Sequence, residues 1–167
     1  MPFLKALLRL VGAIFVLALL QWTWPPMLRW GGQGPDFLLV LTTVLALLNG
    51  PLTGATSGFL SGVFLLAGSA EPPARLLLVR TLLGWGAGLL RRGLFSENLF
   101  VHWLVVSLLT LLEPGLYRGI AWLWAPSPEG LRSVMEDTSI LWLLFHNGWS
   151  TLLLYQWAYR RPINLDE

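Results

Sequence analysis

Long apolar stretches alternate with short polar or proline-rich connections along almost the whole chain. In lipid, backbone groups must hydrogen-bond within their own segment, so stretches of this composition form helices. Most of them approach or exceed the roughly 20 residues needed to cross about 30 Å of lipid tails. The pattern predicts six membrane-spanning helices, at about Leu4–Trp24, Asp36–Leu48, Leu52–Ala70, Ala74–Leu90, Asn98–Trp124 and Asp137–Tyr159. The second stretch is short, so we expect it to cross with little tilt, to thin the bilayer, or to end inside protein.

Composition agrees with a membrane protein. Hydrophobic residues make up 55% of the chain and charged residues only 12%, which is about half the charged share of a soluble domain. The connections leave no room for a separate soluble domain, so residues 1–167 are expected to form one all-α transmembrane domain. The chain has no cysteine, which excludes disulfides, thiolate metal sites and thiol redox motifs.

The basic residues account for the pI of about 9.5 without a nucleic-acid partner. Most of them collect at the two chain ends and in the fourth-to-fifth connection: Lys5, Arg9, Arg91, Arg92, Arg160 and Arg161. The opposite connections hold Arg29, Arg75 and Arg132, beside acidic residues in the longest loop. The positive-inside rule therefore predicts that both termini are cytoplasmic.

This orientation can be tested by labelling, because the chain has no native cysteine to interfere. A single cysteine at Ser96 should resist an impermeant thiol reagent in intact cells, whereas a cysteine in segment 126–136 should react. Reaction at Ser96 in intact cells would contradict the predicted orientation.

Asp36 directly precedes the second apolar stretch and follows a glycine-rich connection. A carboxylate at this position accepts hydrogen bonds from the free amides of the first helical turn and meets the positive end of the helix dipole. We therefore expect Asp36 to cap the second helix.

Two predicted helices carry ridges of small residues. Gly54, Gly58 and Gly62 recur at four-residue spacing in the third helix, and Gly84 and Gly88 repeat it in the fourth. Such ridges allow helix backbones to approach closely in lipid. They predict either packing of the bundle against itself or a docking face for a helix of another protein.

Several polar residues fall inside the apolar stretches, where an unpaired charge is costly and therefore points to a function. Glu113 is expected roughly 16 Å below the outer end of its helix and Arg80 roughly 9 Å below the outer end of the fourth, at 1.5 Å per residue. A long arginine side chain covers this offset if the two helices adjoin, so Arg80 is the expected partner. Arg118 lies about 140° around the helix from Glu113 and is a poorer one. The pair predicts either a structural clip or a polar pocket beside the kink expected at Pro114.

Asn147 lies inside the sixth apolar stretch, and we expect it to hydrogen-bond to another helix. His102 and His146 are expected far apart in depth and without clustered acids, a poor arrangement for a metal site. The glycines around Trp85 are not followed by the Lys-Ser/Thr pair of a phosphate loop. No residue pattern nominates a catalytic centre, so we expect neither enzymatic activity nor a cofactor.

The order of these features resembles the rod shape-determining membrane protein family MreD. Four segments carry the resemblance: Pro35–Leu39, Ala46–Ala55, Gly58–Gly62 and Gly88–Asn98. Glu113 looks like the acidic position of that family's fifth helix, and Asn147 with the terminal Arg160-Arg161 fits its last helix. The similarity runs across nearly the whole chain.

The resemblance implies a non-enzymatic, multi-pass component of the bacterial inner membrane. It would belong to the cell elongation complex, bind the transmembrane helix of MreC, and work near MreB, RodA and a class B penicillin-binding protein. Its fold would be similar to the substrate-binding subunits of energy-coupling-factor vitamin transporters. The main alternative is therefore a small-molecule-binding subunit of such a transporter, which needs a roomy polar and aromatic pocket.

Overall fold

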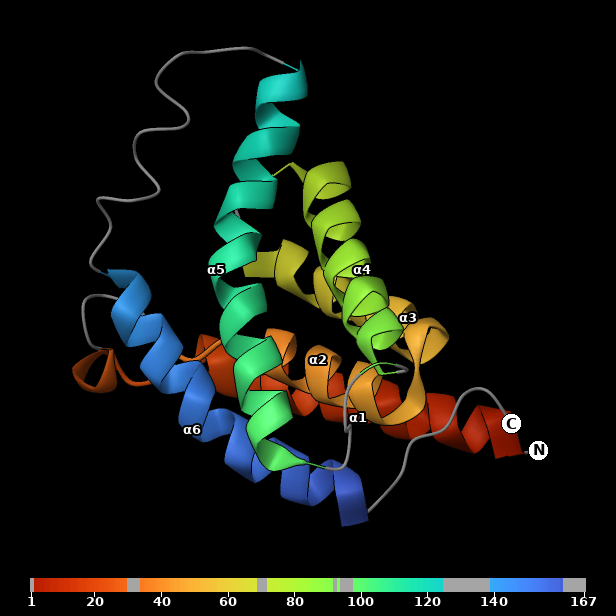
Figure 1. Ribbon diagram of the computed structural model, residues 1–167. Helices are drawn as coiled ribbons and strands as arrows, with labels where there is room; N and C mark the ends of the chain where they lie inside the picture. The colour runs from red at the N-terminus through yellow and green to blue at the C-terminus, as the bar shows by residue number, and fades with distance from the viewer. Residues whose placement is uncertain are drawn as a thin grey trace.

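The computed structural model describes residues 2–29, 34–68, 72–91, 93, 98–124 and 139–160. These residues form α-helices and short 3-10 turns, and none of them forms a strand. The elements in chain order are α1 (Pro2–Trp22), η1 (Pro26–Leu28), α2 (Phe37–Asn49), α3 (Pro51–Leu65), η2 (Leu66–Gly68), α4 (Pro73–Leu90), α5 (Leu99–Trp124) and α6 (Ser139–Arg160). Figure 1 shows them as one splayed bundle, in which α4 and α5 run side by side in opposite directions.

The structure confirms the all-helical class, with a helix in each of the six apolar stretches. Among the described residues, three segments are long and apolar enough to cross a membrane: Leu4–Trp22, Pro51–Gly68 and Leu99–Leu123. α2 is apolar but only 13 residues long, about 20 Å at the helical rise. The six-span topology therefore stays a prediction. The side of the membrane on which segments 94–97 and 126–136 lie also stays a prediction, because both segments are outside the described residues.

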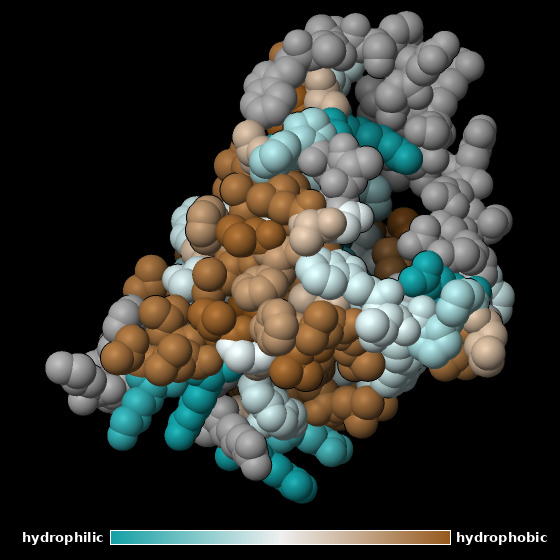
Figure 2. Space-filling view, turned by 180° about the vertical axis from the view of Figure 1, so that it is seen from behind, coloured by the Kyte–Doolittle hydropathy of each residue, from teal (hydrophilic) through white to brown (hydrophobic). Residues whose placement is uncertain are grey.

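The surface agrees with a position in lipid. Large apolar side chains are exposed on every helix except α2. In Figure 2 they form a broad apolar band, with hydrophilic side chains gathered along its lower edge. Four of the basic residues expected on the cytoplasmic side are described, and all four are exposed: Lys5, Arg9, Arg91 and Arg160.

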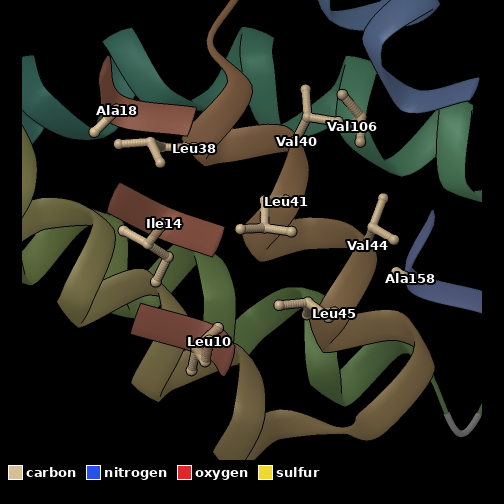
Figure 3. Packing of buried hydrophobic residues seen from close by; sticks show 10 residues of the cluster. All are labelled: Leu10, Ile14, Ala18, Leu38, Val40, Leu41, Val44, Leu45, Val106 and Ala158. Atoms are coloured by element: carbon tan, nitrogen blue, oxygen red, sulfur yellow. The ribbon is translucent and has the colours of Figure 1, made fainter. Parts of the chain in front are cut away.

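α2 lies at the centre of the bundle and contacts each of the other five α-helices. Every one of its residues except Leu48 is buried. Figure 3 shows how both sides are covered: Ile14 of α1 lies against Leu41, and Val106 of α5 lies against Val40. The expectation that the second stretch ends inside protein, rather than crossing alone, fits this burial.

The turn between α2 and α3 is set by two residues. Gly50 has φ 107°, a backbone conformation that favours glycine, and its amide donates to the carbonyl of Ala46 at 2.8 Å. Pro51 then begins α3, where its missing amide proton is not needed. The sequence Asn-Gly-Pro thus ends one helix and begins the next without a loop.

The glycine ridges face each other between α3 and α4. A Cβ on Gly54 would lie 2.1 Å from the carbonyl oxygen of Gly84, and one on Gly58 would lie 2.3 Å from that of Arg80. A Cβ on Gly88 would lie 2.3 Å from the Cα of Pro51, and one on Gly62 would lie 3.1 Å from the Leu77 side chain. Of the two alternatives, packing of the bundle against itself is confirmed. The docking alternative is wrong for these five glycines, because the neighbouring helix already occupies the space beside them.

Candidate functional site

Arg80 lies at the centre of a buried cluster of charges. Its guanidinium Nη1 donates to Asp36 Oδ1 at 3.2 Å, and Nη2 pairs with Asp36 Oδ2. On its other side, Nε lies 2.8 Å from Glu113 Oε1 in a second ion pair. Arg80 and Glu113 are only 5% and 7% exposed. One cation from α4 therefore joins carboxylates from the start of α2 and the middle of α5.

Asp36 also caps α2, as its position in the sequence predicts. Its Oδ1 accepts a hydrogen bond from the amide of Leu39 at 2.9 Å. The same carboxylate thus receives the helix amide and the arginine together. The positive end of the α2 dipole faces the same carboxylate.

Asn147 connects three helices. Its side-chain oxygen accepts from the backbone amide of Asp36 at 2.8 Å, and its side-chain nitrogen donates to Thr110 Oγ1 of α5 at 2.9 Å. Thr110 in turn donates to the carbonyl of Val106 at 2.8 Å. The prediction that Asn147 hydrogen-bonds to another helix is confirmed, and both the oxygen and the nitrogen of its side-chain amide take part.

Together these five residues form what we call the polar clasp: Asp36, Arg80, Thr110, Glu113 and Asn147. Its place in the fold explains why it is polar. The first amides of a helix lack hydrogen-bond acceptors within the helix, and in lipid no water is available to accept from them. Because α2 begins within the protein, Asn147 and the carboxylate of Asp36 supply the acceptors. The polar clasp therefore holds α2, α4, α5 and α6 together at the buried end of α2.

Of the polar residues that the sequence nominates, the structure brings together Asp36, Arg80, Glu113 and Asn147, and it leaves Arg118, His102 and His146 outside the polar clasp. The Arg80–Glu113 pair is confirmed. The contact between Arg80 and Asp36 was missed, because the sequence does not show how deep α2 begins. Arg118 stays outside the polar clasp, in agreement with its poorer position on the helix. α5 continues through Pro114 as a single helix.

The two histidines occupy separate places. His102 is fully buried on α5, with its ring centroid 4.6 Å from that of Tyr155 and its Nδ1 3.1 Å from the carbonyl oxygen of Asn98. His146 on α6 contacts the carbonyl oxygens of Trp142 and Leu28 through its two ring nitrogens. Within the described part of the chain, no three His, Cys, Asp or Glu residues gather closely enough to hold a metal ion.

A groove of about 510 Å³ runs along the outside of the bundle between α5 and α6. Apolar side chains make up nearly all of its surface, and its lining residues are Trp103, Ser107, Leu111, Leu144, Phe145, Gly148, Trp149 and Leu152. On each helix they recur at about four-residue spacing, so the groove follows the helix axes. Sequence reasoning missed it, because both faces of these helices are apolar.

Comparisons with protein-family models, with curated proteins and with solved structures give no match. The functional interpretation therefore rests on the contacts and charges of the described residues. The polar clasp pairs its central cation, Arg80, with two carboxylates. This arrangement connects four helices, α2, α4, α5 and α6.

Proposed function

We propose that this protein is a non-enzymatic, multi-pass component of the bacterial inner membrane that holds a single membrane helix of a partner protein. Following the resemblance to the MreD family, the partner is MreC and the complex is the cell elongation machinery near MreB, RodA and a class B penicillin-binding protein. All six helices belong to the membrane domain in this proposal, with both termini cytoplasmic.

The observation that carries the proposal is that the charged residues of the polar clasp pair with one another, while the described outer surface is largely apolar. Asp36, Arg80, Glu113 and Asn147 bind one another across four helices. The groove between α5 and α6, in contrast, is open and apolar and lies on the outer surface. A vitamin-binding subunit needs polar groups directed into a cavity, whereas a helix adaptor needs an apolar, grooved face.

The groove between α5 and α6 is the surface that we propose for the partner helix. The glycine ridges of α3 and α4 are already filled by each other, so they leave no such face. In the groove, Ser107 is a small, half-buried residue between larger apolar neighbours. Gly148 lies beneath the Trp103 ring, whose Nε1 would be 2.8 Å from a Cβ at this position. Small residues let helices approach closely in lipid, where dispersion forces between well-packed surfaces drive association.

Filling the groove should release the partner without unfolding the protein. Ser107 is half-buried on α5, so Ser107→Trp places a large ring in the groove. We expect at least a tenfold loss of the bitopic partner in affinity purification from native membranes, with an unchanged level of the protein itself. Gly12→Trp on α1 is the matched control, because nothing lies within 4 Å of a Cβ at Gly12.

Two results would contradict the proposal. Equal partner recovery with Ser107→Trp and Gly12→Trp would show that the groove is not the docking surface. Purification of the native protein with a tightly bound vitamin, and without any bitopic partner, would instead favour the transporter subunit.

A further inference from the structure

Arg118 is a half-buried arginine on α5 that lies outside the polar clasp. Its Nη1 is covered by protein without a hydrogen-bond partner among the described residues. The described carboxylates belong to Asp36 and Glu113, and both are paired with Arg80. A buried guanidinium donor without an acceptor costs free energy in an apolar setting. An anion at this position would satisfy both the free N–H donor and the positive charge.

The depth of Arg118 indicates where this anion comes from. The rise from Leu99 to Arg118 is roughly 29 Å at 1.5 Å per residue, close to the 30 Å or so of a bilayer's hydrocarbon core. α5 is one of the helices that can span a membrane, and it continues to Trp124. With Leu99 at one boundary of the lipid tails, Arg118 lies at the other, where lipid phosphates begin.

A second arginine lies at the same level. α4 and α5 run in opposite directions, and the Arg80–Glu113 ion pair fixes their register (Figure 1). Arg75 and Arg118 each lie five residues from that pair, toward the same end of the bundle. Both are half-buried, unlike the exposed Arg29. Two arginine side chains, Arg75 and Arg118, therefore lie at this end of the α4–α5 pair.

We propose that Arg118 binds the phosphate group of a membrane lipid at the Trp124 end of α5, with Arg75 adding positive charge at the same level. The guanidinium is planar, always charged and matched to phosphate oxygens by its paired N–H groups. A lipid phosphate reaches this depth because its acyl chains lie along the apolar surface of α5. The inference stands independently of the elongation function.

The test uses the purified full chain in detergent and measures binding of added phosphatidylglycerol by native mass spectrometry. Arg118→Gln keeps a polar side chain but removes the charge, and we expect it to weaken binding about 10- to 100-fold, the loss typical of a charge-assisted hydrogen bond. Arg118→Lys should recover part of this loss, since it restores charge without the paired donors. Arg29→Gln is the matched control and should bind like the wild type. Diacylglycerol with the same acyl chains, which lacks the phosphate, should show no dependence on Arg118.

Competition identifies the source of the phosphate. If inorganic phosphate displaces phosphatidylglycerol at comparable concentration, the site takes a soluble phosphate; if it does not, the site takes the lipid. The proposal is overturned if Arg118→Gln binds phosphatidylglycerol as well as the wild type does, or if Arg29→Gln weakens binding equally. A further variant neutralises Glu129, Glu136 and Asp137 together. If Arg118→Gln no longer weakens phosphatidylglycerol binding in that background, a loop carboxylate is the partner of Arg118 and the proposal is overturned.

Discussion

Replacing Gly84 with alanine is expected to destabilise the protein severely, whereas the same change two residues later should be harmless. A Cβ on Gly84 would lie 2.1 Å from the carbonyl oxygen of Gly54, so α3 and α4 must separate to admit it. The atom it meets is backbone and cannot rotate away. We expect a loss of more than about 3 kcal/mol, the upper end of the usual cost of overpacking.

Gly86→Ala provides the matched control on the same helix. Nothing lies within 4 Å of a Cβ at Gly86, and alanine favours the helix over glycine by up to about 1 kcal/mol. Unfolding in mixed micelles should therefore show Gly86→Ala at or slightly above wild-type stability. Similar stabilities for Gly84→Ala and Gly86→Ala would contradict the close packing of α3 against α4.

Removal of Arg80 should be the most damaging single change in the polar clasp. Arg80→Leu leaves two buried carboxylates, Asp36 and Glu113, without their shared cation. Breaking a buried ion pair from one side typically costs about 3–5 kcal/mol, because the remaining charge stays uncompensated. Glu113→Gln should cost less, since Arg80 keeps its contacts with Asp36.

A triple-mutant cycle separates this account from a general loss of packing. Arg80→Leu combined with Asp36→Asn and Glu113→Gln removes all three charges, and it should unfold less readily than Arg80→Leu alone. Arg29→Leu, an exposed arginine outside the polar clasp, should change the unfolding free energy little. Additive losses in the combined variant would show that the three charges are not coupled.

The sequence indicates the ends of the helices well, because those ends depend on local chemistry. The third and fourth helices were expected from Leu52 and Ala74, and they begin one residue earlier, at Pro51 and Pro73. Asp36 caps α2 as expected. The Arg80–Glu113 pair was also predictable, since two opposite charges at similar depth in lipid must find each other.

The directions in which the helices face could not be predicted in the same way. In water, the polar face of a helix marks its exposed side, but in lipid both faces are apolar. Gly84 and Gly86 stand in the same Gly-Trp-Gly run, yet only Gly84 meets another helix. The contact between Asp36 and Arg80 was hidden for a related reason. It depends on how far inside the bundle α2 begins, which only the packing of the other helices determines.

The central position of α2 has a consequence for the biosynthesis of the protein. α2 is made before four of the helices that surround it, and its amide partner Asn147 follows Asp36 by 111 residues. A short apolar helix that begins at an acid gains little from entering lipid alone. Its stable insertion therefore has to wait until α4, α5 and α6 have left the ribosome, so the last helix to be synthesised completes the placement of the second.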